Sequence, residues 1–253
     1  MNEPQPDTTL PPTPQPWRPA PDRQALKPGQ VQVFRLALDL PATRMAHLIG
    51  LLSPDEAARA ARFRFEVDRL RFTAGRGQMR CILAAYLHLP PSALIFNYNP
   101  HGKPALVNAP GLHFNLSHSA GVGLLAVCAE QAVGIDNESI RPQVERDNIA
   151  RRFFAPQEAA ALQALPPEQQ LLAFFTCWTR KEAYIKARGL GLHIPLDQFV
   201  VSLAPGEPAR LLTREPGAPA GPFTLAAIDP DPGQVAALAV EGEINTLQLW
   251  DWP

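Results

Sequence analysis

Apolar and polar residues alternate near the start of the folded part of the chain. Residues 31–38 read Val-Gln-Val-Phe-Arg-Leu-Ala-Leu, and this period of two predicts a strand with one buried face. Short apolar runs bounded by Pro and Gly turns predict further strands over 95–99, 105–107, 122–127, 132–136, 199–203, 223–228, 235–240 and 246–250.

A second pattern, with apolar residues three or four positions apart, predicts helices. The longer of the first two spans about 67–87, with core candidates Leu70, Met79, Ile82, Leu83 and Tyr86. Ser53-Pro-Asp-Glu56 has the capping-box pattern with proline at the first helical position, so a helix should begin there. Further helices are predicted over 141–154, 156–165 and 169–188, the last ending at Gly189.

The order of these elements divides the chain. Residues 1–29 are rich in proline and almost free of large aliphatic side chains, so we expect a flexible tail. The remainder falls into two stretches of similar content, 30–133 and 134–253, without an evident sequence repeat. This predicts an α+β fold of two similar lobes, with a ligand in the crevice between them.

Composition sets the broad class of protein. The chain has 253 residues, of which 46% are hydrophobic and 19% charged, as in ordinary globular proteins. Its net charge of −1 provides no field for nucleic acid or an anionic membrane, and no apolar run approaches the roughly twenty residues of a membrane span. The N-terminus lacks the order of a signal peptide. Three well-separated cysteines indicate reduced thiols in a cytoplasmic protein.

The candidate catalytic and metal-binding residues lie in two short segments. Asp136 and Glu138 are two residues apart, so an extended strand places both side chains on one side. Glu182 and Lys186 are four apart, so they share a helix face. Three carboxylates with one ammonium suit a hard cation that holds a polyphosphate. Glu182, directly or through a metal-bound water, is the candidate base for a hydroxyl nucleophile.

Each of these groups also has a simpler interpretation. Asp136 and Glu138 could form a solvated strand end, but the pair closes an apolar strand, where an unpaired carboxylate is costly. Glu182 and Lys186 could form a surface ion pair. The aromatic residues around them, including Trp178, indicate a largely buried helix instead, and a buried pair needs partners.

Ser117 and His118 lie between two apolar strands. A lone histidine is more often structural, but these two side chains could donate hydrogen bonds to a phosphate. The chain has no Gly-x-Ser-x-Gly elbow, no phosphate-binding Gly-x-x-x-x-Gly-Lys loop and no dinucleotide motif. Gly102-Lys103-Pro104 by itself predicts only a tight turn with an exposed lysine.

Taken together, the motifs resemble those of the Sfp-type 4′-phosphopantetheinyl transferases over roughly residues 50–200. In chain order they are Gly102-Lys-Pro, Phe114-Asn-Leu-Ser-His-Ser119, Gly134-Ile-Asp-x-Glu138, Arg152-Phe-Phe and Trp178-x-x-Lys-Glu-Ala-x-x-Lys186. The resemblance implies a pseudo-dimer of two α+β lobes, each a small antiparallel sheet packed with helices. It also implies transfer of phosphopantetheine from coenzyme A to a serine of an apo-acyl, peptidyl or aryl carrier protein, releasing 3′,5′-ADP.

The resemblance assigns the catalytic centre as follows. Asp136, Glu138 and Glu182 would hold Mg²⁺, for which Mn²⁺ could substitute, against the pyrophosphate. Lys186 would contact the phosphate undergoing transfer, and Asp136 would also face coenzyme A. Because the two lobes already pair within one chain, we expect a monomer with neither a nucleic-acid nor a membrane partner.

The same resemblance assigns four further residues to coenzyme A. Lys103, Ser117 and His118 match positions that contact the nucleotide and its phosphates, and Arg59 matches a basic position near the 3′-phosphate. Glu56 departs from the pattern, because some members carry a second basic residue there.

Asn137 departs as well, because it replaces the usual aliphatic residue of the Gly-Ile-Asp-x-Glu motif.

The alternatives to the transferase are a catalytically silent homologue that binds carrier proteins or coenzyme A, and an unrelated magnesium-dependent phosphotransferase acting on small molecules.

Overall fold

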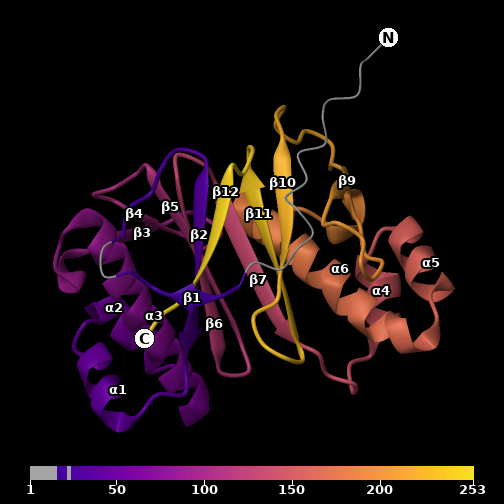
Figure 1. Cartoon of the computed structure of the whole chain (residues 1–253). Coiled ribbons are helices and arrows are strands. Elements are labelled where there is room, and N and C mark those ends of the chain that lie inside the picture. The colour runs from indigo at the N-terminus through magenta and orange to yellow at the C-terminus, as the bar shows by residue number, and fades with distance from the viewer. Residues whose placement is uncertain (1–15, 22–23) are drawn as a thin grey trace.

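The computed structural model describes residues 16–21 and 24–253, and their elements form two lobes side by side (Figure 1). The helices are α1 (Ala42–Ile49), α2 (Pro54–Ala60), α3 (Glu66–Leu87), α4 (Arg146–Phe153), α5 (Pro156–Ala164) and α6 (Pro167–Arg188), with short 3-10 turns η1 (Pro91–Ala93), η2 (Gly191–His193) and η3 (Leu196–Gln198). The strands are β1 (Arg18–Pro19), β2 (Gln30–Ala37), β3 (Phe96–Tyr98), β4 (Pro104–Leu106), β5 (Leu112–Ser119), β6 (Val122–Ala129), β7 (Val133–Ser139), β8 (Val200–Val201), β9 (Leu211–Thr213), β10 (Phe223–Ile228), β11 (Gln234–Glu241) and β12 (Thr246–Asp251). The predicted α+β class is confirmed.

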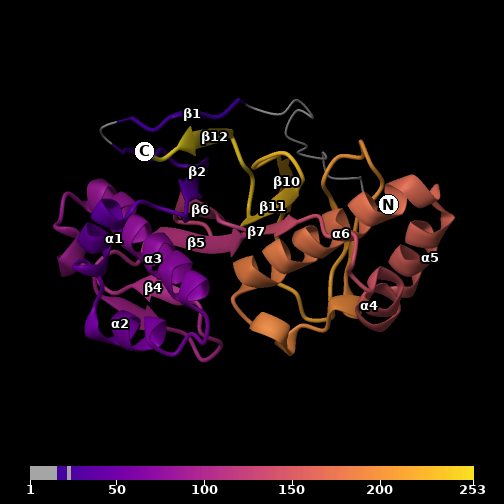
Figure 2. The same ribbon diagram turned by 90° about the horizontal axis from the view of Figure 1, so that it is seen from below.

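The first lobe is built on a five-stranded sheet in the order β1-β12-β2-β6-β5. Its central strand β2 is buried on both faces, whereas its alternation predicts one buried face. The polar Gln32 can be buried because its amide donates to the Ala25 carbonyl and to Gln248. Phe34 and Leu36 pack with Ile82 and Leu83 of helix α3, which covers one face of this sheet. Figure 2 shows α1, α2 and α3 together on that side of the molecule.

The second lobe is built on a three-stranded antiparallel sheet in the order β10-β11-β7. Helix α6 packs on it through a core that includes Phe174, Phe175 and Tyr184. The helix ends at Gly189, whose φ of +67° is the left-handed conformation that glycine adopts without strain. The predicted helix over 169–188 and its end are therefore correct.

A third apolar core joins the two lobes. Val31 and Val33 of the first sheet pack with Ile135 and Leu238 of the second, and all four are fully buried. Because the two sheets share this core, separating the lobes would expose it to water.

The last strand crosses from one lobe to the other. Strand β12 pairs in parallel with β2, so it lies in the sheet of the first lobe although it belongs to the range 134–253. Its Leu247 and Leu249 complete the shared core. The boundary near residue 133 stays a prediction, and strand β12 is an exception to it.

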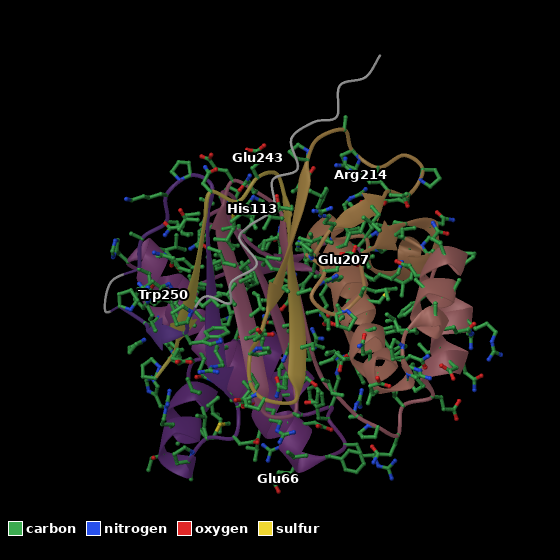
Figure 3. The ribbon with its side chains drawn as sticks, turned by 45° about the vertical axis from the view of Figure 1, so that its right-hand side comes forward. Glu66, His113, Glu207, Arg214, Glu243 and Trp250 are labelled. Carbon is green, nitrogen blue, oxygen red and sulfur yellow. The ribbon has the colours of Figure 1, made fainter. Side chains whose placement is uncertain are left out.

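The prediction of a flexible tail over 1–29 is wrong for residues 16–21 and 24–29; residues 1–15 and 22–23 lie outside the described residues. Strand β1 pairs with β12, which carries Trp250 (Figure 3), and the Trp17 indole donates to the Asp229 carbonyl at 2.8 Å. The Arg35 guanidinium lies 4.8 Å from the Trp17 ring centroid. The proline-rich composition gave no sign of these contacts. The segment contacts the fold through the Trp17 side chain and the pairing of β1, and neither produces a periodic apolar pattern.

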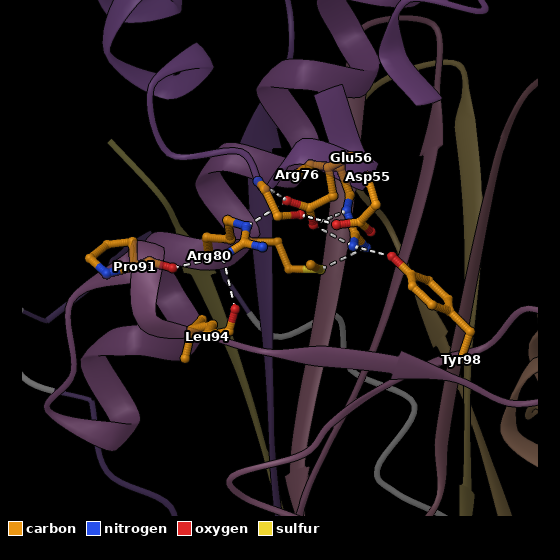
Figure 4. A network of polar contacts seen from close by, with 9 residues as sticks. Asp55, Glu56, Arg76, Arg80, Pro91, Leu94 and Tyr98 are labelled. Carbon is orange, nitrogen blue, oxygen red and sulfur yellow. Dashed lines mark hydrogen bonds and ion pairs between the residues drawn. The ribbon is translucent and has the colours of Figure 1, made fainter. Parts of the chain in front are cut away.

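Both lobes repeat one buried ionic arrangement. Glu56 in α2 and Glu158 in α5 each stand two residues after a proline and accept a hydrogen bond from the backbone N–H three residues earlier. Each also pairs with a buried cation at the same position of a 22-residue helix, Arg80 of α3 at 2.6 Å and Lys181 of α6 at 2.7 Å. Both cations donate to two backbone carbonyls, as Figure 4 shows for Arg80.

Some predicted bounds differ from the structure. The helix predicted over 141–154 begins only at Arg146, since the residue before Pro142 is disfavoured in a helix. The strand predicted over 199–203 is reduced to Val200–Val201. Strand β5 and helix α1 were not predicted, although Leu112, Phe114 and Leu116 alternate with polar residues in β5, and the buried Met45 and Leu48 are three residues apart in α1.

Within the described part of the chain, the helices are all too short or too polar to span a bilayer.

Deleting residues 1–28 should lower the melting temperature, because it removes the contacts of Trp17 and strand β1. Losing about 2 kcal/mol, the contribution of one buried large side chain, would shift Tm by about 4–8 °C in a domain of this size. Calorimetry should compare this deletion with one of residues 1–15, so that the difference isolates residues 16–28. Equal melting temperatures for the two deletions would contradict the docking of this segment.

Glu158→Gln should destabilise the protein strongly, because it leaves the Lys181 ammonium buried beside a neutral amide. Removing one partner of a buried pair costs about 3–5 kcal/mol in free energy of unfolding. The matched control is Glu66→Gln, which breaks the exposed pair with Arg69 and should cost about 0–1 kcal/mol. Urea unfolding measures both, and equal losses would show that the buried pair has no special weight.

Candidate active site

A close approach between strand β7 and helix α6 forms the base of the site. A Cβ atom at Gly134 would collide with the Ala183 carbonyl oxygen and the Ala187 amide nitrogen of the helix. Only glycine therefore allows the two backbones to pack at this distance. One turn of α6 thereby stands directly beside the end of β7, where Asp136 and Glu138 lie.

Asp136 is the centre of the polar contacts. The Lys186 ammonium lies 2.5 Å from Asp136 Oδ1, and the Ser117 hydroxyl donates to the same oxygen at 3.0 Å. Lys186 Nζ also lies 3.2 Å from Ser117 Oγ. Asp136 is only 5% exposed, and its second oxygen, Oδ2, is buried without a hydrogen-bond partner. A buried carboxylate oxygen without a donor is a vacant ligand position for a cation.

A cavity of about 390 Å³ opens beside this pair. Its lining consists of Leu116, Ser117, His118, Asp136, Asn137, Glu138, Trp178, Glu182 and Lys186. Three groups of residues predicted from the sequence therefore line one cavity. They are Ser117 with His118, the strand carboxylates Asp136 and Glu138, and the helix pair of Glu182 and Lys186. The crevice lies between β5 of the first lobe and β7 and α6 of the second.

The cavity is rich in negative charge. Burial and the neighbouring Asp136 carboxylate raise the pKa of Glu182 to about 7, and burial and Asp136 also raise the pKa of Glu138. Burial likewise raises the pKa of Asp136, against the opposing effect of Lys186. One ammonium thus faces three carboxylates. Added positive charge would stabilise their ionised forms.

The predicted metal ligands share the cavity without forming a closed cluster. Over the ranges 16–21 and 24–253, no three His, Cys, Asp or Glu side chains are close enough together to hold an ion as they stand. Lys186 pairs with one oxygen of Asp136, Oδ1, and leaves Oδ2 without a partner. The unpartnered Oδ2 and the oxygen-only donor set nevertheless fit Mg²⁺.

A second cavity of about 460 Å³ adjoins the first and shares Leu116, His118, Glu182 and Lys186 with it. Lys103 and Arg59 line its further part, so it joins two more of the predicted residues to the site. A third cavity, of about 550 Å³, continues past Arg59 to Arg62. The predicted coenzyme A residues therefore follow one path away from Asp136.

Lys103 does not stand as a free cation on this path. Its ammonium donates to the carbonyl oxygens of Val133 in β7 and Ala187 in α6, both at 3.0 Å. Loss of water contact lowers its pKa to about 8. The residue predicted as an exposed lysine on a turn thus ties the β3–β4 hairpin to the second lobe.

The two departures from the motif pattern have structural explanations. Glu56 is 1% exposed and pairs with Arg76 and Arg80, so it cannot serve as a partner for a phosphate (Figure 4). Asn137 points away from the carboxylates, and its amide donates to the Val122 carbonyl at 3.2 Å. Neither substitution removes a group from the cavity.

His118 keeps one donor for a ligand. Desolvation and the Lys186 ammonium lower the pKa of His118, which favours the neutral imidazole with one N–H donor. Two other residues near the cavity were missed from the sequence. Asn115 and Ser119 flank Ser117 at alternate positions of β5, and the period-two polar pattern Asn-x-Ser-x-Ser is the signal that could have found them.

Comparisons with known proteins identify the family of the chain. Residues 132–237 match a model described as the 4′-phosphopantetheinyl transferase superfamily, and residues 41–132 match one described as 4′-phosphopantetheinyl transferase, N-terminal. The chain is 44% identical over 229 residues to 4′-phosphopantetheinyl transferase HetI of Nostoc sp., covering 89% of this chain and 94% of that protein. It is 32% identical to 4′-phosphopantetheinyl transferase Sfp of Bacillus subtilis, covering 68% and 77%.

Among solved structures, holo-[acyl-carrier-protein] synthase (AcpS) of Thermotoga maritima matches 44% of this chain and 63% of its own, with 19% identity. Its TM-score of 0.36 is too low to carry an argument.

The fold is a two-lobed α+β enzyme fold with a crevice lined by three carboxylates and a lysine. The chain belongs to the 4′-phosphopantetheinyl transferase superfamily, and the resemblance predicted from its motifs is confirmed.

Proposed function

We propose that this enzyme transfers 4′-phosphopantetheine from coenzyme A to a serine of an apo-carrier protein and releases 3′,5′-ADP. The observation that carries the proposal is the single cavity in which Asp136, Glu138, Glu182 and Lys186 meet. A silent homologue would be expected to lack a carboxylate or Lys186, and all are present.

A magnesium ion would be held by Asp136, Glu138 and Glu182, with Mn²⁺ as a substitute. The unpartnered Oδ2 of Asp136 and the raised pKa of Glu182 support this assignment, since both indicate a deficit of positive charge. When bound, the ion would neutralise charge on the pyrophosphate of coenzyme A.

Coenzyme A would lie along the adjoining cavities with its pyrophosphate beside Lys186 and His118. Ser117 and Lys103 line the same path, and Arg59 stands where the second and third cavities meet, which suits a terminal phosphate. With coenzyme A placed in this way, the part of the first cavity near Trp178 stays open, and the serine of the carrier protein would enter there.

The chemical step is an in-line displacement. The serine Oγ attacks the phosphorus that bears pantetheine, the anhydride P–O bond breaks, and 3′,5′-ADP leaves with the electron pair. Lys186 stabilises negative charge as that bond breaks. Glu182 accepts the serine proton, directly or through a water. Its pKa of about 7 belongs to the site without a metal, and a bound cation would lower that pKa and weaken the base. The carrier's pathway, a cytoplasmic location and a monomeric state stay predictions.

Glu182→Gln should lower kcat by about a hundredfold or more, because it removes the proposed base and a metal ligand. Asp136→Asn should lose activity to a similar degree. The control is Glu168→Gln, an exposed carboxylate at the start of the same helix, which should leave kcat unchanged. The assay combines the full chain, coenzyme A, Mg²⁺ and a panel of apo-carriers, with the mass of the intact carrier as readout.

Failure of the unchanged protein to load any carrier in this panel would favour the silent homologue. Full activity of Glu182→Gln would instead retain the transferase and remove Glu182 from its mechanism.

The Michaelis constant for coenzyme A should rise between pH 7 and pH 9. Lys103 carries its charge mainly below its pKa of about 8, and an ammonium attracts phosphate more strongly than a neutral amine does. Lys103→Met should show a higher KM at pH 7 and a flatter pH profile, whereas Lys27→Met, an exposed lysine that lines none of the three cavities, should follow the unchanged protein. Parallel profiles for all three proteins would remove Lys103 from coenzyme A binding.

A further inference from the structure

The two sheets meet edge to edge at the active site. Strand β5 is the edge of the five-stranded sheet, and β7 is the edge of the three-stranded one. Side chains of β5, rather than its backbone, accept hydrogen bonds from the β7 backbone. Asn115 Oδ1 accepts from the Ile135 N–H at 2.8 Å, Ser117 Oγ from Asn137 at 3.4 Å and Ser119 Oγ from Ser139 at 3.1 Å.

The two serines of this seam have a second role in common. Ser117 donates its hydroxyl hydrogen to Asp136 at 3.0 Å. Ser119, held by the Ser139 N–H, occupies the corresponding place beside Glu138, and its hydroxyl opposes the rise in the pKa of that carboxyl group. Each serine therefore accepts a hydrogen bond from a backbone N–H of β7. Its hydroxyl faces the carboxylate of the β7 residue just before that N–H. The period of two along both strands repeats this unit once per carboxylate.

A hydroxyl that accepts from a fixed N–H directs its own hydrogen elsewhere. In both units that hydrogen points to a carboxylate, which restricts the rotamer of the acid and favours its ionised form. Two cations, Lys186 and Arg141, act on Glu138, but the Arg141 contact is 3.7 Å long and the Arg141 side chain is 63% exposed. Ser119 is less exposed than Arg141 and is held by its hydrogen bond from the Ser139 N–H.

The third position of the seam provides an internal comparison. Asn115 bonds to Ile135, and the residue before Ile135 is Gly134, which has no side chain to orient. An amide stands there in place of a hydroxyl. The hydroxyl-bearing residues Ser117 and Ser119 stand at the two positions of β5 where the bonded β7 N–H directly follows an acidic residue.

We propose that Ser119 is a positioning residue for Glu138, as Ser117 is for Asp136, and that the pair aims both carboxylates into the cavity. The proposal rests on the metal-binding role proposed above for Asp136 and Glu138. Ser119 is the better residue to test, because Ser117 also contacts Lys186.

Two substitutions that differ only in a hydroxyl form the test. Ser119→Thr keeps the hydroxyl and Ser119→Val replaces it with a methyl group of similar size, and both suit a strand. The readouts are the binding of Mn²⁺ in the presence of coenzyme A, followed by electron paramagnetic resonance, and separate values of kcat and KM. Thr224→Val, which removes a 2.6 Å hydrogen bond to the Gly242 carbonyl within the second lobe, is the control for lost stability alone.

Ser119→Val should weaken Mn²⁺ binding and lower kcat, each by about tenfold or more, because partners of metal ligands typically have that effect. The KM for coenzyme A should change less than about twofold, as expected for a residue that acts through Glu138. Ser119→Thr should behave like the unchanged protein. Thr224→Val should lower Tm without changing Mn²⁺ affinity.

Equal Mn²⁺ affinity and kcat for Ser119→Val and Ser119→Thr would overturn the proposal. Glu138→Gln separates this failure from failure of the metal site. If Glu138→Gln weakens Mn²⁺ binding and Ser119→Val does not, the carboxylate role stands and the positioning role falls. If Glu138→Gln also leaves Mn²⁺ binding unchanged, the proposed metal site itself is wrong.

Discussion

The missing side chain at Gly134 is the constraint on which the site depends. Helix α6 approaches strand β7 so closely that any Cβ there would strike its backbone. This contact, rather than the lobe arrangement as a whole, brings Lys186 within 2.5 Å of Asp136. Because packed backbones resist displacement, the carboxylates of the strand and the charged groups of the helix are held in register before any ligand arrives.

The internal repeat of the fold serves stability, while the seam between its halves carries the chemistry. Glu56 with Arg80 and Glu158 with Lys181 are equivalent pairs, each closing a short helix against a long one. Each lobe could use this arrangement alone. The contacts of β5 with β7, and of Lys103 with Val133 and Ala187, exist once and need both lobes. An active site placed there cannot form in half of the molecule.

The sequence predicts local features well and long-range contacts poorly. Strand β2, helix α3 and the end of α6 at Gly189 follow from periodicity and turn chemistry, which act over a few residues. The candidate site residues were predicted as a group, and all of them line the two adjoining cavities, whereas the Arg152-Phe-Phe motif lines neither. The docking of Trp17, the crossing of β12 and the two carbonyl partners of Lys103 depend on residues far away along the chain. No local pattern encodes these contacts, so composition alone suggested a flexible tail and an exposed lysine.

The ion pair of Lys186 with Asp136 offsets only part of the negative charge of the cavity. A buried carboxylate needs a cation, and the ammonium supplies one. In the proposed reaction the same ammonium is attracted to a phosphate, which would release Asp136 at the moment when a metal can replace it. A metal ion and coenzyme A would both favour separation of Lys186 from Asp136, so each would strengthen binding of the other. The coupling free energy is the same whichever ligand binds first. In the proposed mechanism, Lys186 on one oxygen of Asp136 and the unpartnered second oxygen would therefore link metal binding to coenzyme A binding through a single side chain.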